Sequence, residues 1–333
     1  MFDAESWPYV AIRWIGYTTL LLIIGIGVFR SVVLRAGARL GASGTQVVEL
    51  AELRAAQFGS VATAVLLASC VARLLAQVAA MFGVEYVTDL SQAFTLVTET
   101  TWGRGWIFQV LVAVLAFAAF EMVRRHASRR PDRWWWTSTA AALLLAFTPA
   151  TAGHAMAVAG RTGLAVVSDG LHVLAAGAWI GTLAMLVLVG VPAADRAYPE
   201  EYWYIVQELV GRFSPVAIGA ATLIAATGAY AACLHVGQVP ALWQSPYGRT
   251  LVVKLSALGL VAGLGAYNFL RIRPALDNAS TVRNLRVATA LELAFAMLLL
   301  LITAVLVATP TAREGQSATA LSTSIAFAGS LPA

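Results

Sequence analysis

The sequence predicts an all-α membrane protein, a bundle of about eight transmembrane helices with both termini on the extracytoplasmic side. Three observations predict this fold class. Hydrophobic residues make up 59% of the 333 residues and charged residues only 12%, whereas soluble domains carry about a quarter charged residues. Apolar runs recur at close to the ~20 residues that a helix needs to cross a bilayer. Arginines gather between these runs, mostly on one side of the predicted membrane.

The apolar runs define a single predicted transmembrane domain over 1–308. Compared with the length of a membrane-crossing helix, they give eight predicted spans, near 10–29, 59–82, 105–123, 134–152, 166–189, 212–234, 250–270 and 287–308. The remaining 309–333 is rich in Ser, Thr, Ala and Gly. This composition predicts a flexible extracytoplasmic tail.

The positions of the arginines predict the orientation. Clusters of arginine occupy three of the connections between predicted spans, 30–58, 124–133 and 271–286. Alternating spans place all three on one side, which the positive-inside rule assigns to the cytoplasm. The N-terminus begins with acidic residues and has no positively charged start, so no cleaved signal peptide is expected. The chain is therefore predicted to lie within the lipid bilayer.

Several function classes lack their sequence signals. The net charge of +5 is not accompanied by a basic patch interleaved with aromatic residues, so no nucleic-acid partner is predicted. The sequence contains no P-loop, HExxH motif, nucleophile elbow or dinucleotide-binding fingerprint. We therefore do not expect an enzyme, although a membrane redox activity is kept as an alternative.

Three of the four histidines fall at the predicted outer leaflet, each on a different span. They are His154 after the fourth span, His172 about two turns into the fifth, and His235 at the end of the sixth. One such histidine would be read as a polar residue at the interface, but three at one depth favour a metal site, since imidazole binds copper and zinc. Met156 is a candidate fourth ligand because thioether and imidazole together suit Cu(I). The remaining His126 lies in an arginine-rich connection and is expected to be solvated.

Asp169, Lys254, Arg73 and Glu292 are ionisable residues inside predicted spans, where charge is costly and usually faces the bundle interior. Asp169 shares a helical face with His172, and Lys254 lies at a similar depth. An Asp169–Lys254 pair is one expectation, and Asp169 orienting His172 is the other. Arg73 in the outer half and Glu292 in the inner half are further supporting charges. For Arg73 and Glu292, a purely structural explanation is equally good: each charge could reach the interface by snorkelling or be neutralised by a partner, without any role in transport.

Glycines four residues apart occur twice within predicted spans, as Gly177 with Gly181 and Gly259 with Gly263. This spacing allows two helices to approach closely. We expect both pairs to pack against neighbouring helices.

A series of short motifs follows the chain from about His154 to Pro310. They are Gly153-His154-Ala155, Ser168-Asp169-Gly170-Leu171-His172, Trp179-Ile180-Gly181, Arg212-Phe213-Ser214, Thr227-Gly228, Tyr230, His235, Pro246-Tyr247-Gly248-Arg249, Lys254 and Glu292. Together they resemble the bacterial copper resistance protein D (CopD) family, and the likeness before His154 is topological only. Thr182 departs from the pattern, because many relatives have a second glycine there. This departure puts the local packing in question.

The resemblance implies a multi-pass protein of the bacterial inner membrane that moves or delivers copper, with a small periplasmic copper-carrier protein as a possible partner. With the residues above, it predicts that copper is bound at the extracytoplasmic face and passed across the membrane. Two alternatives stay open. Histidines on neighbouring helices could hold haem b in an electron-transfer protein, or the chain could deliver copper to another protein without any flux.

Overall fold

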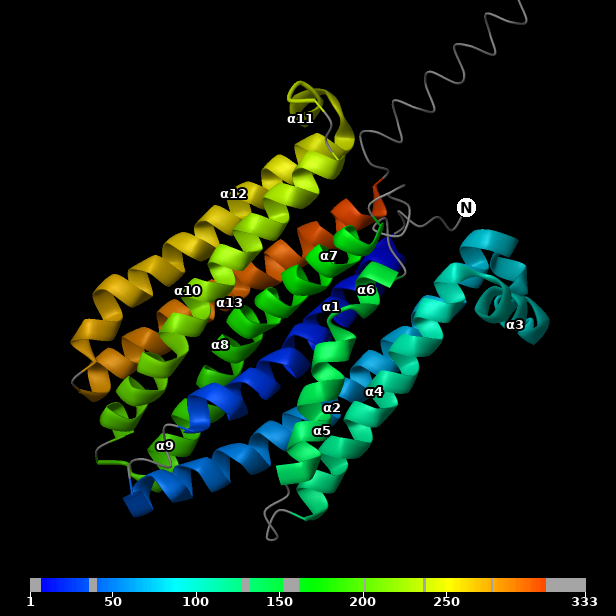
Figure 1. Ribbon diagram of the computed structural model, residues 1–333. Coiled ribbons are helices and arrows are strands. Elements are labelled where there is room, and N and C mark those ends of the chain that lie inside the picture. The colour runs from blue at the N-terminus through cyan, green and yellow to red at the C-terminus, as the bar shows by residue number, and fades with distance from the viewer. Residues whose placement is uncertain are drawn as a thin grey trace, which may run out of the picture.

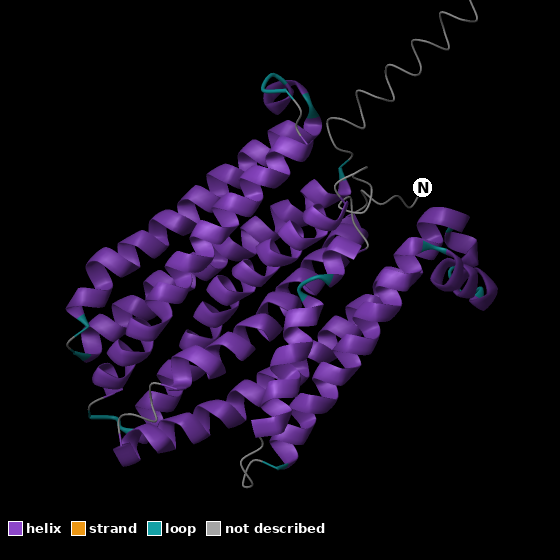
Figure 2. Cartoon of the chain, in the orientation of Figure 1, coloured by secondary structure: helices purple, strands orange, loops and turns teal. Residues whose placement is uncertain are grey.

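The structure is a computed structural model that describes residues 7–35, 41–126, 132–151, 162–200, 202–235, 238–276 and 278–309. Its regular elements are helices throughout, and the described residues contain no strand (Figures 1 and 2). The all-α prediction is therefore confirmed. The predicted tail beyond residue 309 lies outside the described residues.

Seven of the described helical segments are long and apolar enough to cross a membrane. Six of them are the segments that begin with α1 (Trp7–Val28), α2 (Gly41–Phe82), α4 (Thr101–Arg125), α10 (Tyr202–His235), α12 (Pro246–Tyr267) and α13 (Ala279–Ala308). The seventh is a composite segment that runs through α7 (Thr162–Ala176), α8 (Thr182–Met185) and α9 (Val191–Ala197). Wider π-helical turns, Gly177–Gly181 and Leu186–Gly190, join its three parts.

The predicted fourth span, 134–152, is divided into α5 (Asp132–Leu145) and α6 (Thr148–Thr151). The cause is Pro149, which has no amide hydrogen to donate to the carbonyl of Leu145. The hydroxyl of Thr148 donates to that carbonyl instead, at 2.8 Å. Figure 1 shows α6 continuing from α5 along α1 toward the start of α7. An unbroken fourth span was thus a wrong prediction, while the two short helices together follow its course.

Several helices are longer than the apolar runs that predicted them. The 30–58 connection was predicted as a loop, but α2 begins at Gly41 and crosses most of it. Likewise, α10 begins at Tyr202 and α13 at Ala279, well before the predicted 212 and 287. Polar and charged residues in these extensions lower the hydropathy without breaking the helix, so a search for apolar runs misses them.

The bundle has an arginine-rich end and an arginine-poor end. At the arginine-rich end α1 is followed by α2, α4 by α5 and α12 by α13, and the arginine-poor end carries α3 (Leu90–Glu99) and α11 (Ala241–Gln244) (Figure 1). Helix α3 lies between the predicted spans 59–82 and 105–123, where no helix was predicted. Asp89 caps its start, since the Asp89 side chain accepts a hydrogen bond from the amide of Ser91 at 2.8 Å. Leu90 and Phe94 on α3 are 84% and 70% exposed, as expected for a helix lying on a membrane surface.

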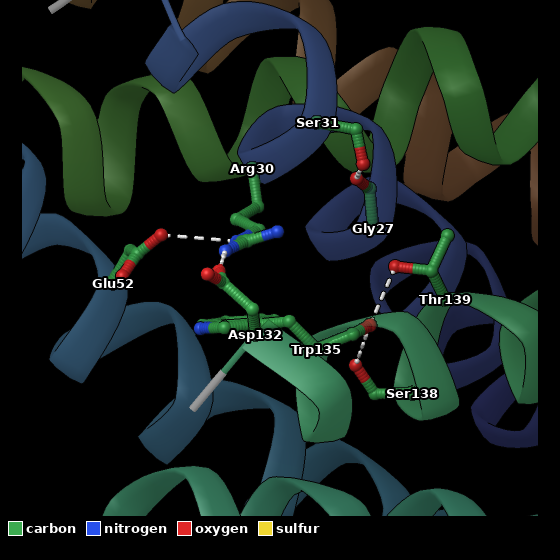
Figure 3. A network of polar contacts seen from close by, with 8 residues as sticks. All are labelled: Gly27, Arg30, Ser31, Glu52, Asp132, Trp135, Ser138 and Thr139. Carbon is green, nitrogen blue, oxygen red and sulfur yellow. Dashed lines mark hydrogen bonds and ion pairs between the residues drawn. The ribbon is translucent and has the colours of Figure 1, made fainter. Parts of the chain in front are cut away.

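A charged cluster ties three helices together at the arginine-rich end (Figure 3). The guanidinium of Arg30 pairs with Glu52 of α2 at 3.0 Å and also with Asp132 at the start of α5. The guanidinium carbon of Arg30 also lies 5.3 Å from the centre of the Trp135 ring. Arg30 thereby fixes the end of α1 against both neighbours.

The composite segment from α7 to α9 occupies the middle of the bundle. In its most apolar stretch, 67% of the residues are buried, whereas only 17% are buried in the corresponding stretches of α10 and α12. The other helices therefore pack around this segment. Helix α1 approaches it closely. A Cβ atom built on Gly181 would lie 2.0 Å from the carbonyl oxygen of Leu21, and one on Gly177 would lie 2.6 Å from the Ile24 side chain.

The two predicted glycine pairs behave differently. Gly177 and Gly181 do pack closely, and Thr182 beside them is fully buried and donates to the carbonyl of Gly25 at 3.3 Å. The departure at Thr182 is therefore accommodated by a hydrogen bond. For Gly259 and Gly263, by contrast, no atom lies within 4 Å of an added Cβ. The prediction that this second pair packs against a helix was wrong, because spacing alone does not reveal which way a helix face points.

Candidate metal site in the arginine-poor half

His172 and Thr227 form the centre of the candidate site. His172 is on α7 and Thr227 on the neighbouring α10, and His172 Nδ1 lies 2.8 Å from Thr227 Oγ1. Gly228 follows Thr227, and a Cβ there would lie 3.7 Å from Cε1 of His172, an ordinary van der Waals distance. The imidazole thus lies next to the backbone of α10.

The hydrogen bonds of Thr227 favour one tautomer of His172. The Thr227 hydroxyl lies 2.7 Å from the carbonyl oxygen of Leu223 and 3.3 Å from that of Ile224. With its single proton donated to one of these helix carbonyls, the hydroxyl oxygen accepts, and a neutral His172 ring carries its proton on Nδ1 and donates it to Thr227. Nε2 keeps its lone pair, which is the arrangement of a histidine that binds a metal ion.

Asp169 and Lys254 place opposite charges near this histidine. Asp169 lies three residues before His172 on α7, and Lys254 projects from α12. The Lys254 ammonium attracts the Asp169 carboxylate and lies within electrostatic range of the His172 ring. No direct ion pair joins Asp169 to Lys254 in the described part of the chain. The hydrogen bond that orients His172 comes from Thr227, not from Asp169.

The other predicted ligands cannot be compared with His172. His154 and Met156 lie outside the described residues. His235 is the last residue of α10, but its side chain is likewise outside the described set. Within the described residues no group of three or more His, Cys, Asp or Glu side chains comes close enough to hold a metal ion. Convergence of the three histidines therefore stays a prediction.

Glu292 forms a second polar centre further along the bundle. Its carboxylate is almost completely buried, accepting a hydrogen bond from Trp179 Nε1 at 3.2 Å and another from Asn268 Nδ2 at 2.8 Å. Both donors lie in π-helical turns, Gly177–Gly181 and Asn268–Ile272. Such turns are frequent at functional sites, because they redirect side chains.

A cavity of about 350 Å³ opens beside Glu292. Its walls come from α10, α12 with the turns that follow it, α13 and the part of the composite segment that begins at Trp179, and most of them are apolar. The polar side chains on its walls are Glu292, Asn268, Ser214, Thr222, Thr289 and Arg273. Arg273 belongs to the arginine-rich end, so the cavity leads from the middle of the bundle toward that end.

Arg73 was predicted as a supporting charge in the outer half. It lies on α2, with its guanidinium carbon 5.5 Å from the centre of the Trp102 ring of α4. It joins Arg13 and Tyr17 of α1 around a separate small cavity. Arg73 is thus part of a third polar cluster.

Sequence reasoning placed Asp169, His172 and Lys254 at one depth but missed the partners that complete the two polar centres. Thr227 was noticed only as part of a family pattern. Asn268 gave no signal, because a single asparagine near the end of an apolar run looks like an ordinary boundary residue. Both partners depend on helix rotation, which hydropathy does not report.

Comparison with known proteins gives a consistent family. The family profile described as Copper resistance protein D matches residues 207–306, and the one described as Copper resistance protein D-like, N-terminal domain, matches residues 1–164. The chain is 27% identical over 302 residues to Copper resistance protein D of Pseudomonas syringae pv. tomato, covering 87% of this chain and 93% of that protein.

A second relative is longer. The chain is 29% identical over 176 residues to the Copper transport protein CutJ of Bacillus subtilis (strain 168), which covers 53% of this chain but only 31% of that protein. No solved structure matches significantly. The resemblance from His154 onward thus extends to the N-terminal half, and the chain belongs to the copper resistance protein D family.

Proposed function

We propose that this chain binds copper in its arginine-poor half through His172 and transfers it across a bacterial inner membrane. The observation that carries the proposal is the pair of hydrogen bonds at Thr227. They leave Nε2 of His172 free as a metal ligand, in a ring that is already oriented. The names of the two relatives, a copper resistance protein and a copper transport protein, favour copper as the cargo.

The charges around His172 suit a cation that is to be released again. Asp169 would stabilise a bound copper ion, while Lys254 would weaken its binding. A site that combines both charges can bind a copper ion and still release it. His154, His235 and Met156 remain the proposed additional ligands, and a periplasmic copper-carrier protein remains the proposed donor or acceptor.

The polar centre at Glu292 supplies a second binding position for the ion, which we call the second station. It lies beyond Trp179 and opens into the cavity that leads to Arg273. A buried carboxylate can hold a metal cation or a proton that moves in exchange for one. We infer that copper passes from His172 toward Glu292 and leaves through the cavity.

The first test is the copper content and absorption spectrum of the purified protein. Wild type is expected to hold near-stoichiometric copper without a Soret band, and His172→Ala to lose most of it. His126→Ala is the matched control, since His126 lies at the arginine-rich end, where its Nδ1 is 3.0 Å from the carbonyl of Met122. Equal copper in wild type and His172→Ala would overturn the proposal.

The same protein separates the two rival functions. A Soret band that weakens in His172→Ala would identify a haem protein. Copper binding without copper uptake into liposomes would identify a delivery factor that performs no transport. Uptake that depends on His172 supports transfer across the membrane.

A further inference from the structure

A third polar cluster lies in the arginine-poor half, apart from His172 and Glu292. It surrounds a small cavity of about 20 Å³ between α1, α2, α4 and α6. The polar walls come from Arg13 and Tyr17 of α1, Ser69 and Arg73 of α2 and Gln109 of α4, and the Ser69 hydroxyl donates to the carbonyl of Leu66. A cavity of this size holds one occupant about as large as a water molecule.

The walls of this cavity present unused hydrogen-bonding atoms. Nη1 of Arg13 and both Nε and Nη2 of Arg73 are buried and have no hydrogen-bond partner. The same holds for Oε1 of Gln109, a residue that is only 4% exposed. Buried donors of a charged group are costly when unpaired, so an occupant that accepts hydrogen bonds is required.

The charge of the cluster favours an anion over a water molecule. No carboxylate in the described part of the chain forms an ion pair with Arg13 or Arg73, and Asp169 acts on Tyr17 of the cluster only through space. The guanidinium carbons lie over aromatic rings, Arg13 at 4.2 Å from the Tyr9 centre and Arg73 at 5.5 Å from the Trp102 centre. Within the described residues the rings offer no hydrogen-bond acceptor in the plane of either guanidinium, and the unpaired N–H groups of both arginines remain for another acceptor. Water would satisfy donors but leave two like charges uncompensated in a membrane interior.

Gln109 fits the same occupant. Its amide oxygen and nitrogen are assigned only from their hydrogen bonds, and here Oε1 has no partner. Exchanging the two atoms turns an unpaired acceptor into an NH₂ donor beside the two arginines. All three side chains then donate into the cavity.

We propose that this cavity binds one small monovalent anion, chloride, between Arg13 and Arg73. The volume excludes phosphate and sulfate, whose tetrahedral oxygens need more room. Chloride matches the size and accepts several N–H bonds at once. The site does not depend on the copper proposal, because none of its walls belongs to the His172–Thr227 pair.

Binding of radioactive chloride to copper-free protein in detergent tests the site. Equilibrium dialysis in gluconate buffer is expected to find a single chloride per chain in wild type. Arg73→Gln is expected to weaken binding by about tenfold or more, since charged hydrogen bonds are lost. Arg104→Gln is the matched control, because Arg104 is an exposed arginine on α4 outside the cavity.

A second variant keeps the test decisive if Arg73→Gln folds poorly. Gln109→Glu is nearly isosteric and supplies its own negative charge. It should abolish chloride binding and make the thermal unfolding temperature independent of chloride, whereas the wild-type temperature rises with chloride. Wild type without bound chloride, or Gln109→Glu that binds chloride normally, would overturn the proposal. Copper content is measured separately, so either proposal can fail alone.

Discussion

At the scale of single residues, Thr227 has more influence than its size suggests. A hydroxyl proton donated to the Leu223 carbonyl favours a hydrogen on Nδ1 of His172. The proposed metal binding by an imidazole on α7 thus depends on a side chain on α10. Partners of this kind typically change metal affinity by about 10–100-fold when they are lost.

Replacing Thr227 with valine tests this dependence. Thr227→Val keeps the shape but removes the acceptor for Nδ1, so copper affinity should fall by about tenfold or more. A competition titration with a coloured Cu(I) chelator measures the change. Thr222→Val is the control, because Thr222 makes the same bond to its own helix, to the Ile218 carbonyl at 2.9 Å. Equal affinities in the two variants would contradict the role of Thr227.

Replacing Glu292 should impair copper transport and leave copper binding intact. Glu292→Gln removes the charge and leaves either Trp179 or Asn268 facing an amide NH₂ in place of a carboxylate oxygen. Copper binding at His172 should be unchanged while copper uptake into liposomes falls by about tenfold or more, since the buried charge is lost. Ser214→Ala alters the wall of the same cavity without removing charge and should transport normally. A Glu292→Gln variant with full uptake would remove the second station.

At the scale of elements, the contact between α1 and the composite segment from α7 to α9 fixes the centre of the bundle. Gly25 and Gly181 face each other so closely that a Cβ on Gly25 would lie 2.1 Å from the carbonyl carbon of Gly181. No side chain fits between these backbones. The composite segment, which carries Asp169, His172 and Trp179, is thus held in one position along α1.

Gly181→Ala should therefore destabilise the protein by about 1–3 kcal/mol, the usual cost of overpacking a core. Gly263→Ala provides the contrast, because nothing lies within 4 Å of its Cβ and alanine favours helix by roughly 0.8–1 kcal/mol over glycine. Thermal unfolding of both variants in detergent measures the difference. Similar unfolding temperatures would show that α1 and the composite segment are not in such close contact.

Seven of the eight predicted spans correspond to a long apolar helical segment in the described residues, but the ends of these helices were placed poorly. Apolar composition marks the part of a helix inside lipid, so the runs near 10–29 and 250–270 agreed with α1 and α12. The same signal is lost where α2 extends into a charged region, as around Glu52 and Arg54. The break at Pro149 was visible in the sequence, but the apolar run around it suggested continuity.

The candidate site divides in a similar way. Depth follows from position in a span, so the sequence alone is enough to group Asp169, His172 and Lys254. Contacts between helices follow from rotation and tilt, which neither hydropathy nor spacing encodes. Thr227 and Asn268 were therefore found only through their hydrogen bonds.

At the scale of the whole molecule, the two ends of the bundle differ in charge, and this predicts the orientation in the membrane. The ends of α1, α4 and α12 bring arginines together, whereas the end with α3 and α11 has few. The arginine-rich end is expected in the cytoplasm. The His172 site would then load from the outside.

Cysteine labelling tests this orientation. In a chain without Cys70 and Cys233, Thr88→Cys places an exposed thiol next to α3, and Ser280→Cys places one at the start of α13. A membrane-impermeant maleimide should label the first in intact spheroplasts and the second only after permeabilisation. The reverse pattern would invert the topology and the direction of loading.

The backbone contact of Gly25 with Gly181 also has an evolutionary consequence. At Gly181 every other amino acid places a carbon atom on the Leu21 carbonyl, so selection has a single residue to choose from. The lipid-facing surfaces of α10, α12 and α13, where much less of each helix is buried, carry no such restriction. Sequence divergence among descendants of this chain should therefore accumulate on those outer helices. The residues at the contact between α1 and the composite segment should change very little.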